Sequence, residues 1–189
     1  MRTPSLLLTV LCVATISLQC LDATDDDYLS GPKKVTNILF YLHNTHSGKD
    51  PSSVLVAQNA NATAHAQGFL PFSYVYVYND LLTEGPSSKS KVVGNAQGMY
   101  ASTAKDGNTI LETIDHEITD GPFKGSSFVL FSRNPFMLPR RELPVIGGRG
   151  AFRMAQGFAY LRTVCVNCVN SGNPSKGDII EYNVTLFHY

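Results

Sequence analysis

Short segments rich in branched and aromatic residues alternate along this chain with turn-forming stretches, and this pattern restricts the fold more than any other feature. The turn-forming stretches combine glycine, proline, serine, asparagine and aspartate, as in THSGKDPSS, KDGN, DGPFKG and NSGNPSKGD. The expected strands cover residues 37–44, 68–80, 91–103, 108–119, 126–134, 141–148, 152–164 and 178–189. Pro144 makes the segment 141–148 an expected edge strand or bend. About eight short strands without helical periodicity between them predict an all-β sandwich or barrel.

The first and last strands indicate how side chains divide between the inside and the outside. In the last strand the even positions from Ile180 to Leu186 are apolar, whereas Glu181, Asn183 and Thr185 lie between them. Sugar on Asn183 would place this second face outside. In the first strand both faces are mostly apolar, so both are expected to be covered. A closed barrel that packs against other subunits satisfies this condition.

The N-terminus has the pattern of a secretory signal peptide over residues 1–23. Arg2 supplies a positive charge, and the apolar run from Leu6 to Leu18 is too short to span a bilayer. Residues 24–189 then form one domain that is expected to be secreted. Sequons at Asn61 and Asn183 fit a secreted glycoprotein. No other apolar run approaches the length of a membrane helix, so no membrane partner is expected.

Secretion decides how the cysteines are interpreted. Cys12 lies within the expected signal peptide and Cys20 close to its end, which leaves Cys165 and Cys168 in the stretch CVNC. In an oxidising compartment these two cysteines predict a local disulfide, or two free thiols in a hairpin. A redox-active CxxC is disfavoured because that motif belongs at the start of a helix. A zinc site would need a second pair of ligands, and none is suitably spaced.

The sequence argues against phosphate and nucleic-acid ligands. Gly147, Gly148 and Gly150 lie in the stretch GGRGAF, which lacks the third glycine of a dinucleotide fingerprint and is followed by no helix. These glycines instead predict a tight reversal between two strands. Fifteen basic and fifteen acidic side chains cancel, so the chain has no electrostatic footprint for nucleic acid.

Common catalytic and metal-binding patterns are missing from the sequence. No GxSxG occurs. Neighbouring side chains on a strand point to opposite faces, so the three residues from Asp115 to Glu117 cannot converge. His43 and His46 lie where a strand runs into a turn, so no metal site is expected there. The polar residues that remain at strand ends and turns are Asn44, Asp80, Asn134, Arg141 and Glu142, and each alone is more typical of a hydrogen-bonded turn residue than of a site.

Several motifs, taken together, resemble the plant dirigent family. They are NILFYLHN, GNAQGMY, SRNPF with RRELPVIGGRGAFRMAQGFAYL, and the closing GDIIEYNVTLFHY. The resemblance covers Val35 to Tyr189, with Arg149 and Gln156 departing from the family's usual threonine and arginine. It implies an eight-stranded antiparallel β-barrel with a pocket inside, assembled as a homo-oligomer, either a dimer or a trimer.

The resemblance also implies an activity that needs no cofactor. A separate laccase or peroxidase generates phenoxy radicals, for example from coniferyl alcohol, and the protein directs the stereochemistry of their coupling to lignans in the apoplast. Coupling of radicals has almost no barrier, so an aromatic cavity with a few polar anchors suffices. Four residues are expected to act on the substrate: Arg141, Asp80, Asn44 and Tyr100. Four more are expected to bind it: Phe40, Leu42, Asn134 and Phe152.

Two alternatives to radical coupling remain. Some relatives convert a hydroxylated isoflavanol to a pterocarpan through a quinone methide, which requires a general acid. The stretches RNP and EYNV with the final HY are similar to that branch, but Asn44 and Asn134 stand where the family often has aspartate. Asp80 is the acidic residue expected to compensate. The second alternative is a plant defence protein that binds a phenolic or a glycan without catalysis.

Overall fold

The computed structural model describes residues 31–60, 69–169 and 176–189. The expected signal peptide and the sequon at Asn61 lie outside these ranges. Within them the chain forms nine β-strands and one short 3₁₀ helix, η3 (Gly150–Phe152). The strands are β1 (Lys34–Thr45), β2 (Ser53–Ala57), β3 (Val75–Thr83), β4 (Val92–Ser102), β5 (Ile110–Ile118), β6 (Ser127–Asn134), β7 (Arg141–Arg149), β8 (Gln156–Val169) and β9 (Lys176–His188).

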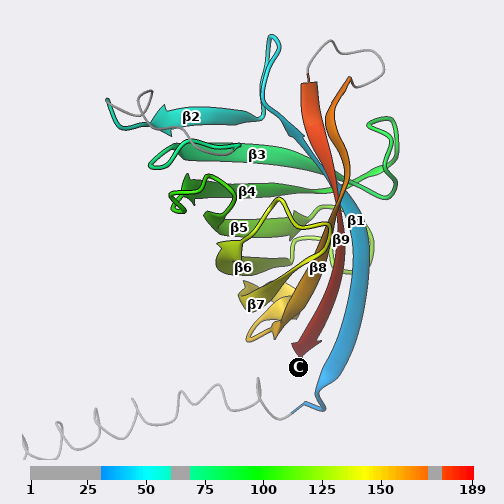
Figure 1. Ribbon diagram of the computed structural model, residues 1–189. Helices are drawn as coiled ribbons and strands as arrows, with labels where there is room; N and C mark the ends of the chain where they lie inside the picture. Colours follow the sequence, from blue (N-terminus) through cyan, green and yellow to red (C-terminus); the bar gives the residue numbers. More distant parts are fainter. Residues whose placement is uncertain (1–30, 61–68, 170–175) are drawn as a thin grey trace, which may run out of the picture. The chain divides into compact units, whose positions relative to one another are not determined.

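Eight of these strands close into an antiparallel barrel, as predicted. The strand order is β1-β9-β8-β7-β6-β5-β4-β3, and a further pairing of β1 with β3 closes the ring (Figure 1). The ninth strand, β2, pairs with β3 outside the ring. The strand β2 was not predicted from the sequence, because its apolar run of Val54, Leu55 and Val56 is short and directly follows the turn-forming stretch THSGKDPSS.

Two strands share one edge of β3, and this sharing creates a seam in the barrel. The second half of β3 pairs with β1, from Leu81 to Thr83. Its first half pairs with β2, from Val75 to Tyr78. Asp80 lies between the two ladders, where β1 turns away from β3 and β2 takes its place. Polar side chains can gather at this position because the backbone of β3 has no continuous neighbour there.

The barrel interior is packed by the alternating residues that the sequence pattern indicated. Along β9, Tyr182, Val184 and Leu186 are buried, whereas Asn183 is exposed on the outer face. A group of stacked rings fills part of the interior. Phe40 stacks on Tyr182 with a centroid separation of 5.2 Å, and His116 stacks on Phe128 at 4.8 Å. These contacts leave the remaining interior space as a cavity.

The glycine stretch differs from the tight reversal that we expected. Gly147 and Gly148 belong to β7, and only Gly150, with a φ of +64°, lies in the turn. A side chain at Gly148 would collide with the carbonyl oxygens of Ser127 and Phe152, so the close approach of these backbones requires glycine there. The segment is therefore partly strand and partly turn.

Strand β7 is an interior strand of the barrel, although Pro144 had suggested an edge or a bend. It pairs with both β6 and β8, but the ladder with β6 ends at the Leu130–Val145 pair. Pro144 therefore pairs only with β8, so its missing N–H disrupts no second ladder. Two other predicted boundaries were also inaccurate, because β3 begins at Val75 and β8 at Gln156.

The outer face of β1 exposes several apolar side chains in the single chain. Val35 and Leu39 on β1 are 59% and 55% exposed, so the expected cover over this face does not come from the chain itself. Among the described residues, no helix has the length and apolar character needed to cross a membrane.

Candidate functional site

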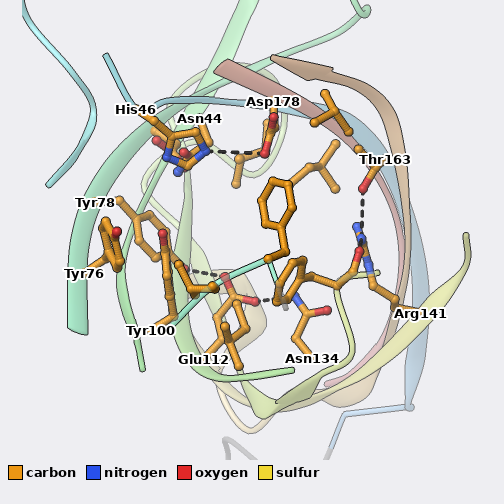
Figure 2. Close-up of a pocket in the computed structure, with 18 of the residues that line it drawn as sticks. Asn44, His46, Tyr76, Tyr78, Tyr100, Glu112, Asn134, Arg141, Thr163 and Asp178 are labelled. Carbon is orange, nitrogen blue, oxygen red and sulfur yellow. Dashed lines mark hydrogen bonds and ion pairs between the residues drawn. The ribbon is translucent and has the colours of Figure 1, made fainter. Parts of the chain in front are cut away.

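A cavity of about 530 Å³ lies within the barrel. Its walls combine aromatic rings with many polar and ionisable groups (Figure 2). The tyrosines lie on one side of the view and Arg141 on the opposite side. The residues that line the cavity include Leu42, Asn44, His46, Tyr76, Tyr78, Asp80, Tyr100, Glu112, Asn134, Arg141, Thr163 and Tyr182.

Asp80 faces the cavity from the seam between β1 and β2. The Asn44 side chain donates a hydrogen bond from Nδ2 to Oδ2 of Asp80 at 2.7 Å. The Ser52 hydroxyl donates to Oδ1 at 2.5 Å. Asp80 is only 1% exposed, and this burial raises its pKa to about 7, although the two hydrogen bonds oppose the shift. The carboxyl group is therefore divided between its acid and its base form near neutral pH.

Glu112 on β5 provides a second buried carboxyl group. Tyr78 donates its hydroxyl hydrogen to Oε1 at 2.8 Å, and Asn134 donates from Nδ2 to Oε2 at 2.8 Å. Burial raises the pKa of Glu112, while these donors and the charge of Arg141 act in the opposite direction. Glu112 thus links three strands, β3, β5 and β6, across the floor of the site.

Four tyrosines supply most of the aromatic surface. Tyr76 stacks on Tyr100 with a centroid separation of 4.8 Å, and Tyr78 packs against Tyr100 at 5.9 Å. Burial raises the pKa of Tyr78, Tyr100 and Tyr182 above the ordinary phenol value, so these hydroxyls stay protonated. The resulting wall offers flat apolar rings together with neutral hydrogen-bonding groups, which suits an aromatic ligand.

Arg141 presents a positive charge to the cavity. Its Nη1 donates to the carbonyl oxygen of Phe136 and to the hydroxyl of Thr163, both at 2.8 Å. Arg141 is 3% exposed, and its Nε and Nη2 atoms have no hydrogen-bond partner among the described residues. Burial lowers the pKa of the guanidinium, yet arginine stays protonated in proteins. Arg141 therefore brings a positive charge to the cavity wall, together with two buried donors that have no partner in the described part of the chain, and this charge favours an anionic oxygen of a ligand.

The structure brings most of the predicted site residues together. Arg141, Asp80, Asn44 and Tyr100, expected to act on the substrate, all line the cavity. Two of the four expected binding residues, Leu42 and Asn134, also line it. Glu142 points outward, as strand alternation requires next to the inward Arg141.

Phe40 and Phe152 do not line the cavity, contrary to our expectation. Phe40 points into the barrel but is covered by Tyr182, on which its ring stacks. Phe152 lies in η3, where it packs against Phe123 and Phe128. Both rings are fully buried in the core. Both residues lie in motifs that carried the family resemblance, but such a motif does not tell a ring in the core from a ring that contacts a ligand.

Glu112, Tyr78, Tyr182 and Thr163 also line the cavity but were not predicted from the sequence. The alternation of β5 could have predicted Glu112, because this residue is in phase with Ile110, Ile114 and Ile118 and must point inward with them. The same phase places His116 in the core, where burial lowers its pKa to about 3. Asp115 and Glu117 face the other way, in agreement with the argument that these three residues cannot converge.

No metal site is evident in the part of the chain that the structure describes. These residues include no group of three or more histidine, cysteine, aspartate or glutamate side chains placed to hold a metal ion. The polar groups of the cavity instead hydrogen-bond to one another, in the Asn44–Asp80 and Tyr78–Glu112–Asn134 contacts. The site thus offers acids, phenols and one guanidinium to a ligand.

Comparison with known proteins identifies what this barrel is similar to. Residues 35–187 match the family described as Dirigent-like protein. Dirigent protein 23 of Arabidopsis thaliana is 41% identical over 160 residues, which cover 84% of this chain and 81% of the relative. Pterocarpan synthase 1 of Glycyrrhiza echinata is 38% identical over 159 residues, covering 83% of this chain and 80% of the relative.

A solved structure supports the same assignment. The structure of a pterocarpan synthase dirigent protein superimposes with a TM-score of 0.72 and 36% sequence identity, covering 83% of this chain and 89% of the other. At 36% sequence identity two proteins share more than a fold, so this structure supports membership of the same family.

Proposed function

Because this chain belongs to the dirigent protein family, we propose that its cavity binds a phenolic substrate and controls the stereochemistry of a new bond. The reaction that the geometry supports best is a cyclisation through a quinone methide, with loss of water and without a cofactor. The observation that carries this proposal is Asp80, a buried carboxyl group with a pKa of about 7 inside an aromatic cavity. The relatives named pterocarpan synthase add support.

Asp80 is suited to general-acid catalysis because its acid form is available near neutral pH. In the proposed first step, Asp80 gives its proton to the benzylic hydroxyl of a hydroxylated isoflavanol. The benzylic C–O bond breaks and water leaves. The phenol para to the ring carbon that bears this centre releases its proton to solvent and becomes the carbonyl of the quinone methide. The Asn44 and Ser52 hydrogen bonds fix the direction in which the carboxyl group points.

The second step forms the ring. A hydroxyl oxygen elsewhere in the substrate attacks the benzylic carbon, and the π electrons of the exocyclic C=C bond return to the ring. The former carbonyl oxygen becomes a phenolate, which takes back one proton from solvent. The attacking hydroxyl returns its proton to the Asp80 carboxylate, so the site is regenerated and the net change is the loss of one water. The wall of tyrosines presents one face of the substrate to the attacking oxygen, which fixes the product's handedness.

Arg141 has a complementary role in this scheme. As the leaving oxygen departs, the phenol donates electron density to the benzylic carbon. A phenolate donates more strongly than a neutral phenol, so this step is faster from the phenolate. The positive charge of Arg141, which lines the cavity, can stabilise that phenolate electrostatically. The contacts with Phe136 and Thr163 hold the guanidinium in place before the substrate binds.

Stereoselective coupling of phenoxy radicals is the second candidate function. The tyrosine wall favours it, because stacked rings can hold two phenols face to face. In this case a separate laccase or peroxidase supplies the radicals, and Arg141 orients their oxygen atoms. Neither buried acid is needed for radical coupling, which is why we rank it second.

One experiment with two arms tests the choice. Purified protein is incubated with a hydroxylated isoflavanol without oxidant, and with coniferyl alcohol plus a one-electron oxidant, and each product is resolved on a chiral column. The proposal predicts a dehydrated, cyclised product of one handedness in the first arm. Enantiomeric excess only in the second arm would favour radical coupling. Binding of a phenol without product in either arm would indicate a binding protein.

We also propose that the protein acts in the apoplast as a glycosylated homo-oligomer. The signal-like N-terminus and the exposed position of Asn183 support secretion and glycosylation. The exposed apolar side chains Val35, Leu39 and Phe187 support burial of this outer face against further subunits. Mass measurement of the intact protein before and after deglycosylation, with light scattering for the assembly, tests each part separately.

A further inference from the structure

Strand β8 carries an irregular segment at the stretch CVNC. Its register against β9 shifts between Thr163 and Cys165 and again between Cys165 and Cys168. A disulfide joins Cys165 to Cys168 across the second shift. Between them Asn167 adopts a φ of +51°, a conformation uncommon for residues other than glycine. The disulfide therefore closes a small bulge made by Val166 and Asn167.

The bulge lies at the mouth of the cavity. Val166 and Asn167 both line the cavity, yet both are exposed, with Val166 at 56%. A side chain that faces the cavity and solvent together marks the place where the cavity opens. Phe69 and Met137 meet the same two conditions, at 60% and 55% exposed. We call these four residues the mouth.

Two sets of contacts connect the bulge to the polar groups of the site. The backbone N–H of Asn167 donates to Oδ1 of Asp178 at 2.9 Å, and Oδ2 of Asp178 lies 3.4 Å from Nε2 of His46. Asp178 is the partner of Asn44 in the β1–β9 ladder, and the Asn44 side chain donates to Asp80.

On the other side of the bulge, Thr163 immediately precedes the first register shift. Its hydroxyl accepts the hydrogen bond from Arg141. The bulge is therefore connected to Asp80 on one side of the cavity and to Arg141 on the other.

We propose that the Cys165–Cys168 disulfide makes the bulge a specificity element, which holds Val166 against the part of a bound ligand that reaches the mouth. This inference rests on the phenolic ligand class of the proposed function. A polycyclic phenol that extends from Arg141 to the mouth contacts Val166. A single-ring phenol bound at Arg141 does not reach it. The disulfide therefore selects for the larger ligand by fixing one side of its binding surface before it enters.

The test measures binding, so it does not depend on whether any reaction occurs. Isothermal titration gives the Kd of a hydroxylated isoflavan and of 4-hydroxybenzyl alcohol for the natural protein and for the Cys165→Ser/Cys168→Ser double variant. We expect the double variant to bind the isoflavan about three- to tenfold more weakly, because the bulge must be ordered on binding. Its Kd for the single-ring phenol should be unchanged. Equal changes for both probes, or none, would overturn the proposal.

A matched pair of variants covers the case in which the double variant does not fold. Val166→Ala removes the side chain at the mouth. Val164→Ala removes the same side chain two residues earlier, at a position that is also exposed but is not part of the cavity wall. Weaker isoflavan binding in Val166→Ala alone supports the proposal, and equal behaviour of the two variants contradicts it.

Amide hydrogen exchange tests the same element without a ligand. The Asn167 amide is hydrogen-bonded to Asp178, so it should exchange faster in the double variant than in the natural protein. Unchanged protection of this amide would overturn the proposal even if neither phenol binds. If neither phenol bound to the natural protein but the Asn167 amide exchanged faster in the double variant, the role of the disulfide would stand and the phenolic ligand class of the proposed function would be contradicted.

Discussion

Asn44 and Asp80 meet across the seam of the barrel, where Nδ2 of the amide donates to Oδ2 of the carboxyl at 2.7 Å. Sequence analysis treated Asn44 as a lost acid, because relatives often carry aspartate at this position. The structure gives the amide a definite partner instead. It binds one oxygen of Asp80 while Ser52 binds the other, so the single acid of the seam is held in a fixed orientation.

Replacing Asp80 with asparagine should remove the general acid and leave the fold intact. General-acid catalysis contributes roughly 10²- to 10⁴-fold, so we expect cyclisation by Asp80→Asn to slow by that order. Single-turnover rates with a hydroxylated isoflavanol measure the effect. Asp106→Asn is the matched control, because Asp106 is exposed on a turn and its side-chain oxygen accepts a backbone hydrogen bond that asparagine can keep. Equal rates in the two variants would show that Asp80 is not the acid.

The raised pKa of Asp80 also predicts how stability changes with pH. The folded protein keeps the proton up to a pKa of about 7, whereas the unfolded chain releases it near 3.8. The contribution of Asp80 to the free energy of unfolding is thus fully present below pH 3.8 and is lost as pH rises through about 7. Between these two values the free energy of unfolding falls by about 1.4 kcal/mol per pH unit. Glu112 shifts in the same direction, so the comparison must be made against Asp80→Asn.

The measurement is the free energy of unfolding by denaturant for both proteins between pH 4 and about pH 8. The difference in this free energy between the natural protein and Asp80→Asn should decline up to about pH 7 and then level off. A constant difference would mean that Asp80 titrates at its ordinary pKa in the folded state.

Arg141→Ala should impair binding rather than folding. The substitution removes the two hydrogen bonds of Nη1 and also an incompletely paired buried charge, so the two effects on stability oppose each other and the protein should stay folded. Loss of the positive charge beside a phenolate should weaken binding by about 10- to 100-fold. Arg133→Ala is the control, since Arg133 is exposed on β6 and faces away from the cavity. If the phenol bound Arg141→Ala as tightly as Arg133→Ala, the anchoring role would be wrong.

Much of the site was predictable because strand alternation and family motifs both point to the inward residues. Arg141 begins and Asn44 ends an expected strand whose phase is clear in the sequence, and both residues line the cavity. The seam was not predictable, because it depends on β2, a strand of five residues with little apolar burial. Without β2 nothing in the sequence placed Ser52 beside Asp80.

The errors at Phe40 and Phe152 have a different physical cause. Both positions face the interior, as alternation predicts, but an interior face does not distinguish the core from the cavity. That distinction depends on which large side chain lies above. Tyr182, contributed by a strand almost at the other end of the chain, covers Phe40. Such a contact follows from the closure of the barrel and has no local signature.

Asn44→Asp should move the pH dependence of the reaction to higher pH. The substitution places a second carboxyl group at the position that now donates to Asp80, and two carboxyl groups this close share one proton. The pair's upper apparent pKa should therefore exceed the value of about 7 that Asp80 has beside the amide, and the acid form should persist to higher pH. Rates of cyclisation measured from pH 5 to about pH 9 in both proteins locate the alkaline decline. A decline at the same or a lower pH in the variant would mean that the two side chains are not coupled through the contact seen in the structure.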